Sequence, residues 1–393
     1  MAKRLAIPSD ELKLRIVGPY DQLDIARVQR FTINKEVPST SIYEIGNPQI
    51  AGTSLDTPNV TLTFSVFDVG VRTFAVLTGN DPANFPNAGV DISDLQEVDA
   101  IVFVKDASVS DYVKSAHAKR LQVRDFAFAY SVDGESTEDY TLIGSEARWF
   151  KNDVIVDRFI IGTTSFALSQ TPIVLKNANY GLSVILDGAY LTEVTGAPGT
   201  GEYRIVGTTL TTGDSMASQV MAVYHVNPVG NNWADISEPQ VPAATRGKDV
   251  KIEIAANNIP RVQNVSINGT LNTQAVKELG NTAVVGYQRQ VPEVTGTIAV
   301  LDTDTELMDL LLNGSISSGD TEFEIGVECV SSGVDLSVKI LDPCDASTVL
   351  KTVYIPEMIL TGDAYASTVN QNATHTFNWR SDTAECIVYS GEP

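Results

Sequence analysis

The feature that most constrains the fold of this chain is a repeat within it. The segment 27–79 resembles the segment 261–314, and one constant offset, which places Arg27 on Arg261, aligns them without a gap from Arg27/Arg261 to Asp68/Asp302. The identical pairs are Arg27/Arg261, Val28/Val262, Gln29/Gln263, Ile33/Ile267, Asn34/Asn268, Glu44/Glu278, Gly46/Gly280, Asn47/Asn281, Gly52/Gly286, Pro58/Pro292, Val60/Val294, Thr61/Thr295, Thr63/Thr297, Val66/Val300 and Asp68/Asp302. A repeat of this kind predicts two copies of one domain in a single chain.

The repeated segment predicts a half-buried strand followed by a short helix. Apolar residues alternate with Thr and Ser over 60–66, and the second copy keeps this pattern over 294–300, with Gly296 marking a bulge or a close approach. Thr303 and Glu306 have the spacing of a capping box before the apolar face formed by Leu307, Leu310 and Leu311. Gly79 and Gly314 stand where a glycine ends such a helix.

Similarity between the copies continues on both sides of this segment. Residues 13–17 match 251–255, and residues 99–106 match 335–342, each pair predicting a strand. Leu121–Tyr130 is aligned with Thr352–Thr361. A polar turn, 131–138 or 363–373, then leads to a return strand in each copy.

We therefore predict a mainly β protein in three parts. Residues 1–150 and 248–393 are expected to form two tandem β-sandwich or barrel domains, each with one short helix. Residues 151–247 belong to neither repeat, and their short apolar runs at 154–161, 182–186, 202–206 and 219–226 predict an inserted small β-domain. We expect a surface decoration there, followed by an extended linker over 227–246.

Composition restricts the partners of the chain. The formal net charge is −22, from 49 acidic and 27 basic residues. General binding to nucleic acid or to an anionic membrane needs clustered Lys and Arg, so both are disfavoured. The charge fits either simple solubility or a surface that must release a polyanion. The N-terminus lacks an apolar stretch after its basic residues, and no run reaches eighteen apolar residues, so neither secretion by a signal peptide nor membrane insertion is expected.

A search for catalytic, cofactor or metal motifs finds none. The three histidines, His117, His225 and His375, have no ligand spacing, and ordinary hydrogen-bonded histidines are expected. The three cysteines have no paired spacing and predict buried free thiols. The acidic runs 133–139 and 302–306 predict a solvated face and a helix cap. We expect that the protein is not an enzyme and uses no cofactor.

Each copy also contains a long polar segment before its core strand, at 35–57 and 269–291. Segments of this length between strands are usually functional. The alternatives are an exposed Ω-loop without a partner and a loop or hairpin that reaches a neighbouring subunit. The residues that we single out as candidates for contacts between subunits or rings are Lys35, Glu36, Glu44, Asn47, Asp56, Lys277, Glu278, Asn281, Arg289 and Gln290.

The order of these elements resembles the tail tube (major tail) proteins of tailed bacteriophages. The likeness rests on a strand, a long polar loop, a Thr-rich alternating strand, a short helix and a hairpin of the LQVRDFAFAYSVDGES…YTLIG type. It covers both repeats, and it is strongest to members whose tube domain is duplicated and carries an accessory β-domain. The position of the insert between the copies is a departure from that pattern.

The resemblance implies a structural role in the virion tail, after assembly in the host cytoplasm. Three chains would form a pseudo-sixfold ring, and stacked rings would form the conduit for genome ejection. The long loops would become ordered on stacking, and an acidic lumen wall would repel DNA. The implied partners are the chain itself, the tape-measure protein, the tail terminator and tip proteins, and double-stranded DNA in transit, without membrane insertion.

Two other functions remain open from the residues alone. A carbohydrate- or receptor-binding β-sandwich is the main alternative, although the aromatic residues lie in strand interiors and not in turns. A hydrolase with carboxylates on a β-scaffold has less support, because no paired Asp/Glu constellation is visible.

Overall fold

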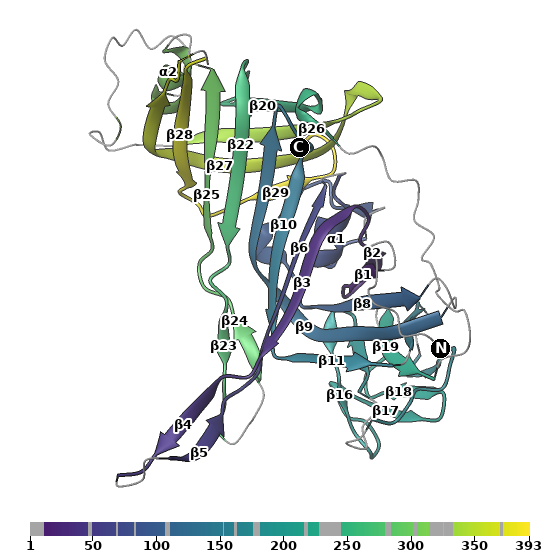
Figure 1. The fold of residues 1–393 in the computed structure, drawn as a ribbon. Helices are drawn as coiled ribbons and strands as arrows, with labels where there is room; N and C mark the ends of the chain where they lie inside the picture. The colour runs from purple at the N-terminus through teal and green to yellow at the C-terminus, as the bar shows by residue number, and fades with distance from the viewer. Residues whose placement is uncertain are drawn as a thin grey trace.

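The structure is a computed structural model that describes residues 12–45, 49–67, 70–81, 84–106, 111–151, 153–160, 163–175, 181–215, 219–227, 245–279, 284–301, 305–313, 325, 333–369 and 372–393. Over these residues strands dominate, and each repeat contains one short α-helix (Figure 1). The predicted mainly β class is confirmed. No sheet in these ranges closes on itself into a barrel.

The first repeat consists of two sheets that share one long, bent strand, β9 (Asp111–Ser131). The first half of β9 pairs with β8 and β11, and its second half pairs with β10. The other elements are β1 (Leu12–Val17), β2 (Gln22–Asp24), β3 (Val28–Glu36), β4 (Ser39–Tyr43), β5 (Ile50–Leu55), β6 (Asn59–Phe67), α1 (Arg72–Leu77), β7 (Val90–Asp91), a 3-10 turn (Ile92–Asp94), β8 (Val98–Asp106), β10 (Thr137–Gly144) and β11 (Glu146–Phe150).

The second repeat has the same strand order around its own bent strand, β27 (Asp345–Ala366). In this repeat β20, β26 and β27 take the places of β1, β8 and β9, while β22, β25 and β28 take the places of β3, β6 and β10. Its elements are a 3-10 turn (Gly247–Asp249), β20 (Val250–Ile254), β21 (Asn257–Asn258), β22 (Val262–Thr270), β23 (Gln274–Val276), β24 (Gly286–Gln288), β25 (Glu293–Leu301), α2 (Glu306–Asn313), β26 (Val334–Asp342), β28 (Thr374–Ser381) and β29 (Ile387–Tyr389).

One predicted alignment of the repeats is wrong. The hydrogen-bonded ladders align β9 with β27 so that Arg120 matches Glu357, and Leu121–Tyr130 therefore does not correspond to Thr352–Thr361. In this alignment the bend coincides, because Arg120 and Glu357 have positive φ values of 50° and 48°. Their N–H groups donate to equivalent carboxylates, Arg120 to Asp99 (3.0 Å) and Glu357 to Asp335 (3.2 Å). The turn after β27 also begins later than predicted, since β27 continues to Ala366.

The predicted half-buried strands are confirmed. β6 and β25 each bury every second residue, and the buried set forms one core that runs through both repeats. Gly296 lies on β25, where a Cβ would come within 2.3 Å of the Trp379 ring. Side-chain packing between β25 and β28 therefore requires glycine at this position.

The short helices lie close to their predicted places. Helix α1 ends at Leu77, and Gly79 follows its C-cap with a φ of 71°. Gly79 N–H donates to Val76 and Asn80 N–H donates to Ala75, as in a Schellman cap. Helix α2 begins at Glu306. Thr303 and Gly314 lie outside the described residues.

Residues 153–226 contain two small sheets with a core of their own, lower right in Figure 1. The apolar runs seen in the sequence lie in β12, β14, β17 and β19. The strands are β12 (Asp153–Phe159), β13 (Ser165–Ala167), β14 (Ser183–Leu186), β15 (Ala189–Tyr190), β16 (Thr192–Glu193), β17 (Glu202–Val206), β18 (Thr209–Thr212) and β19 (Val220–Val226). Most of the predicted linker lies outside the described residues.

No helix in the described part of the chain has the length and apolar character needed to cross a bilayer.

Candidate assembly interface

The two repeats are joined by a direct strand pairing, which we call the internal seam. The second half of β9 pairs antiparallel with β22, from Asp125 opposite Thr270 to Ser131 opposite Asn264. The result is a continuous sheet in the order β3-β6-β10-β9-β22-β25-β28-β27, which we call the long sheet. Its strands run side by side through the centre of Figure 1.

Side chains pack tightly at the internal seam. Phe128 and Ile267 lie opposite each other, and both are fully buried. Gly269 lies opposite Phe126, and a Cβ on it would come within 1.9 Å of the Phe126 ring. The seam is therefore built like the interior of a domain, with complementary shapes on its two strands.

A buried ion pair crosses the same boundary. Lys351 of β27 is fully buried, and its ammonium group contacts the carboxylate of Glu138 on β10. Tyr140 donates to the same carboxylate at 2.9 Å, and the Lys351 ammonium lies 4.5 Å from the centroid of the Phe128 ring. The sequence predicted a solvated acidic face over 133–139, and Glu138 contradicts that prediction.

The long sheet has two open edges. On one side β3 pairs only with β6, and on the other the second half of β27 pairs only with β28, within the described residues. These two strands are the repeat counterparts of β22 and β9, which form the internal seam. The open edge is reflected in side-chain exposure, because Phe128 is fully buried, whereas its counterpart Tyr365 is 59% exposed. Each edge therefore presents unpaired backbone groups and uncovered side chains.

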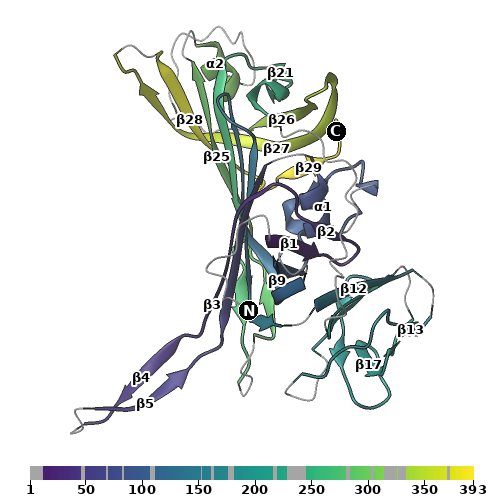
Figure 2. The same ribbon diagram turned by 45° about the vertical axis from the view of Figure 1, so that its right-hand side comes forward.

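The long polar segment of the first repeat forms a projecting hairpin. β4 and β5 pair with each other and extend well beyond the body of the molecule (Figure 2). Most of their residues are exposed, including Tyr43 and Leu55, which are 71% and 70% exposed. The hairpin continues the pairing of β3 with β6, and Asp56 N–H donates to the carbonyl oxygen of Pro38 at 2.8 Å between the two pairings. The segment is therefore a hairpin and not an Ω-loop, and its strands are formed in a single chain.

The equivalent hairpin of the second repeat, β23–β24, lies against the first repeat. Lys277 forms an ion pair with Asp56 at 3.2 Å, and Arg289 donates to the carbonyl oxygen of Ser93 at 2.7 Å. Burial raises the pKa of Tyr287 to about 12, and the nearby Glu97 acts in the same direction. The docked hairpin β23–β24 thus shows how such an arm can lie against an adjacent repeat.

The candidate contact residues are therefore divided between four places. Lys35 and Glu36 lie on the open edge β3, and Asp56 lies at the base of the first hairpin. Glu44 and Glu278 are exposed near the two hairpin tips. Lys277, Arg289 and Gln290 flank β23–β24, where Gln290 donates to Gln274 at 3.2 Å. Asn47 and Asn281 lie outside the described residues.

The long sheet has one covered face and one open face. The covered face holds the core, and strand pairing places the alternate residues on the open face. These are mainly Thr, Ser, Asn and Ala, for example Thr63, Thr141, Ser266 and Thr297. Its charged members are Arg30, Glu36, Asp125, Asp139, Glu293 and Arg380. This face is rich in hydroxyl groups, and four of its six charged residues are acidic.

The insert is fixed to the first repeat by apolar and polar contacts. Val17, Ile101 and Phe103 pack against residues of β12, β14 and β19. In the same region His117 Nε2 is hydrogen-bonded to the Asp99 carboxylate at 2.7 Å, and His117 Nδ1 lies 3.1 Å from His225 Nε2. Tyr190 of the insert also donates to Asp99 at 2.9 Å.

This polar network favours neutral His225. Burial, together with the neighbouring positive groups, lowers the pKa of His225 to about 2, and its Nδ1 has no hydrogen-bond partner among the described residues. Burial alone would raise the pKa of Asp99, but the His117 hydrogen bond and charge hold it below its usual value.

Docking of the insert should therefore weaken in acid. An unfolded His225 takes up a proton below pH 6.5, whereas the folded one stays neutral, so the folded state loses about 1.4 kcal/mol per pH unit below 6.5 from this residue. We expect His225→Gln to show a smaller loss of unfolding free energy between pH 7 and pH 5 than the parent chain, in urea titrations. Equal losses would contradict the assignment.

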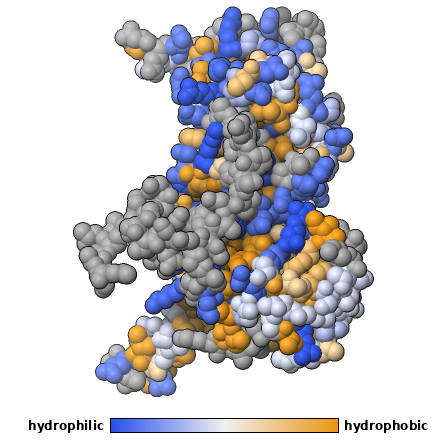
Figure 3. All heavy atoms as spheres, turned by 90° about the vertical axis from the view of Figure 1, so that its right-hand side faces the viewer, coloured by the Kyte–Doolittle hydropathy of each residue, from blue (hydrophilic) through white to orange (hydrophobic). Residues whose placement is uncertain are grey.

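The insert exposes apolar side chains, among them Ile160, Val174 and Val206. Figure 3 shows hydrophobic areas in the lower half of the face that it draws. They are distributed among hydrophilic neighbours. Scattered apolar residues of this kind are normal on a protein surface.

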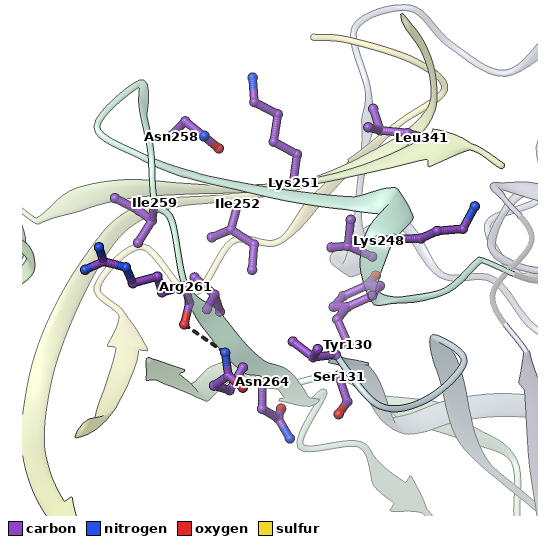
Figure 4. Close-up of a pocket in the computed structure, with 15 residues that line it drawn as sticks. Tyr130, Ser131, Lys248, Lys251, Ile252, Asn258, Ile259, Arg261, Asn264 and Leu341 are labelled. Atoms are coloured by element: carbon purple, nitrogen blue, oxygen red, sulfur yellow. Dashed lines mark hydrogen bonds between the residues drawn. The ribbon is translucent and has the colours of Figure 1, made fainter. Parts of the chain in front are cut away.

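A pocket of about 390 Å³ lies where the end of β9 meets β20 and β22 (Figure 4). Its lining contains Lys248, Lys251 and Arg261 but no Asp, Glu, His or Cys. Lys248 and Lys251 are each paired with an acidic neighbour, and their ammonium groups point away from the cavity. In the described part of the chain, no cluster of three or more His, Cys, Asp or Glu is arranged to hold a metal ion.

The remaining candidates from the sequence are His375 and the three cysteines. His375 bonds to Asp363 at 2.8 Å, as an ordinary hydrogen-bonded histidine. Cys386 is buried as expected, and burial raises the pKa of its thiol. Cys344 is exposed, which corrects the prediction of buried thiols, and Cys329 lies outside the described residues.

Comparisons with known proteins add little to this geometry. No family model matches the chain, and no curated protein matches it. Among solved structures, one match is a chain of a structure titled "Virion of native gene transfer agent (GTA) particle". It is 18% identical and covers 38% of this chain and 100% of that chain, with a TM-score of 0.26. At that score the likeness carries no conclusion about this chain.

Proposed function

We propose that the chain is a structural virion protein whose copies join edge to edge into rings that stack into a tail tube. The observation that carries this proposal is the internal seam together with the two open edges. The chain already contains one junction between repeats, and it leaves open the strand counterparts of both sides of that junction. A second chain can therefore add to each edge in the same way.

The way in which chains can assemble depends on which edges they join. The open edges are different strands, so the contact between chains is head to tail and has to close into a ring or continue as a helix. A closed ring removes every exposed edge of the long sheet, which an open oligomer does not. We propose closure with three chains, which supply six quasi-equivalent repeats.

In such a ring we place the open face of the long sheet on the inside. The bulky parts, namely the second sheet of each repeat and the insert, lie on the covered face, and a larger radius has more room for them. The lumen wall would then carry hydroxyl and amide groups with few ions. DNA phosphates would pass a surface that lacks the basic clusters needed to hold them.

The hairpin β4–β5 is proposed to join one ring to the next. It projects from the body, exposes apolar side chains and has little support within its own chain. Because its strands are formed already, stacking would dock a preformed arm, and large-scale ordering of a loop is not needed. The other partners are the tape-measure protein, the terminator and tip proteins, and DNA in transit. The protein would act without catalysis, in the virion tail, after assembly in the host cytoplasm.

Electron microscopy of the purified, concentrated chain tests this function. We expect rings and hollow tubes with sixfold features built from three chains. Monomers that persist at high concentration and bind glycans would contradict the proposal and favour a receptor-binding role.

A further inference from the structure

The contact between chains can be derived in register from the contact within one chain. β22 corresponds to β3 with Arg261 on Arg27, and the positive φ values of these two residues, 64° and 54°, coincide in that alignment. β27 corresponds to β9 with Glu357 on Arg120, and in that alignment the bulges at Thr361 and Arg124 also coincide. Both correspondences therefore rest on backbone geometry as well as on sequence.

Applied to the internal seam, these two alignments predict which residues of two chains face each other. Ile267 opposite Phe128 becomes Ile33 opposite Tyr365. Asn268 opposite Ala127 becomes Asn34 opposite Ala364, and Ser266 opposite Ala129 becomes Thr32 opposite Ala366. The new pairs keep the size and polarity of the old ones, as expected for strands that meet in the same way.

One pair changes its chemistry completely. Gly269 opposite Phe126 becomes Lys35 opposite Asp363. A lysine would not fit at Gly269 in the internal seam, where the Phe126 ring fills the space above the glycine. Two positions on different strands have thus changed together into residues of opposite charge, which is the combination that stabilises a cross-strand pair.

The positions that correspond to the buried ion pair also carry different residues. The counterparts of Glu138 and Lys351 are His375 and Lys114, so the lysine is kept and the acid is replaced by histidine. An acid is still present at this place, because His375 bonds to Asp363 at 2.8 Å. In a single chain Lys114 is exposed and lies 4.6 Å from the centroid of the Trp149 ring.

We propose that Asp363 of one chain binds Lys35 and Lys114 of the next chain, with Tyr365 packed on Ile33. This inference rests on the proposed ring and names the residues that select its partner, a second copy of this chain. The internal seam is apolar at this point, whereas the seam between chains is charged and partly exposed. Association between chains should therefore be steered by charge and weakened by salt, whereas the internal seam should be insensitive to both.

Charge inversion tests the proposal. We expect Asp363→Lys to raise the protein concentration needed for ring formation by about tenfold or more, because like charges then face each other across the seam. Asp363→Asn, which keeps the size and loses the charge, should give a smaller increase in the same direction. Combining Asp363→Lys with Lys35→Asp and Lys114→Asp should restore ring formation. Glu392→Lys makes the same charge change at an exposed site outside the seam and serves as the control.

Molar mass by light scattering, at low and high salt, gives the readout, with thermal melting to verify that each variant folds. Rings that form equally well in the parent chain and in Asp363→Lys would overturn this inference and leave the ring itself intact. A parent chain that forms no rings would instead overturn the proposed function. Restoration by the inverted variant supports both.

Discussion

Replacing Glu138 by alanine is expected to destabilise the folded chain by about 3–5 kcal/mol, because it removes the carboxylate that the buried Lys351 ammonium group contacts. Lys351 reaches Glu138 from the other repeat, so the loss falls on the boundary between the two repeats. We expect the urea midpoint to fall sharply and the two repeats to lose their common transition.

The double variant Glu138→Leu with Lys351→Met is the matched control. It removes both charges and keeps similar volume, and replacements of this kind are often neutral or stabilising. Its midpoint should lie much closer to that of the parent chain than the midpoint of the single variant does. A single variant as stable as the parent would show that Lys351 reaches solvent or another acid.

Replacing residues 40–54 by Asn-Gly is expected to abolish tube growth without unfolding the chain. Ser39 and Leu55 face each other at the base of the hairpin, so a two-residue turn can join them. The removed residues contribute little to the core, and the melting temperature should stay within a few degrees of the parent value. Because the edges of the long sheet are intact, single rings should still form.

Electron microscopy and light scattering together distinguish the outcomes of this experiment. Single rings without tubes would assign β4–β5 to stacking. Tubes of normal length would contradict that role. Loss of rings as well as tubes would place the hairpin in the seam between chains.

The sequence predicted the repeat well because identical residues lie where backbone geometry is demanding. Arg27 and Arg261 share a positive φ, and the alternating strands β6 and β25 share a core face. The alignment of β9 with β27 failed because a bend and a bulge, which have no clear side-chain signature, set the register. The predicted alignment followed a few chance similarities between Leu121–Tyr130 and Thr352–Thr361 instead.

The partners of the acidic residues could not be predicted, because they come from distant parts of the chain. Glu138 lies in a polar run and meets Lys351 only after the repeats pack together.

The surface on which the insert docks could have been predicted from the sequence. Residues 101–104 are continuously apolar, whereas the matching residues 337–340 alternate, which indicates a strand that is covered on both faces only in the first repeat. A hairpin was one of the alternatives for the polar segments, but its strands could not be located because residues such as Thr, Ser and Gly give no clear alternation of apolar and polar side chains there.

Disulfide cross-linking tests the central claim, that β27 of one chain pairs with β3 of the next, most directly. The chain would carry Asn34→Cys and Ala364→Cys, with its three native cysteines replaced, and the pair Asn34→Cys with Ala366→Cys would serve as a control in a shifted register. Directly opposed positions lie within the reach of a disulfide, whereas the shifted pair lies beyond it. We predict covalent dimers and closed trimers, with nothing larger, from the first pair and little cross-linking from the second. Monomers alone from the first pair, or equal cross-linking from both, would contradict the account.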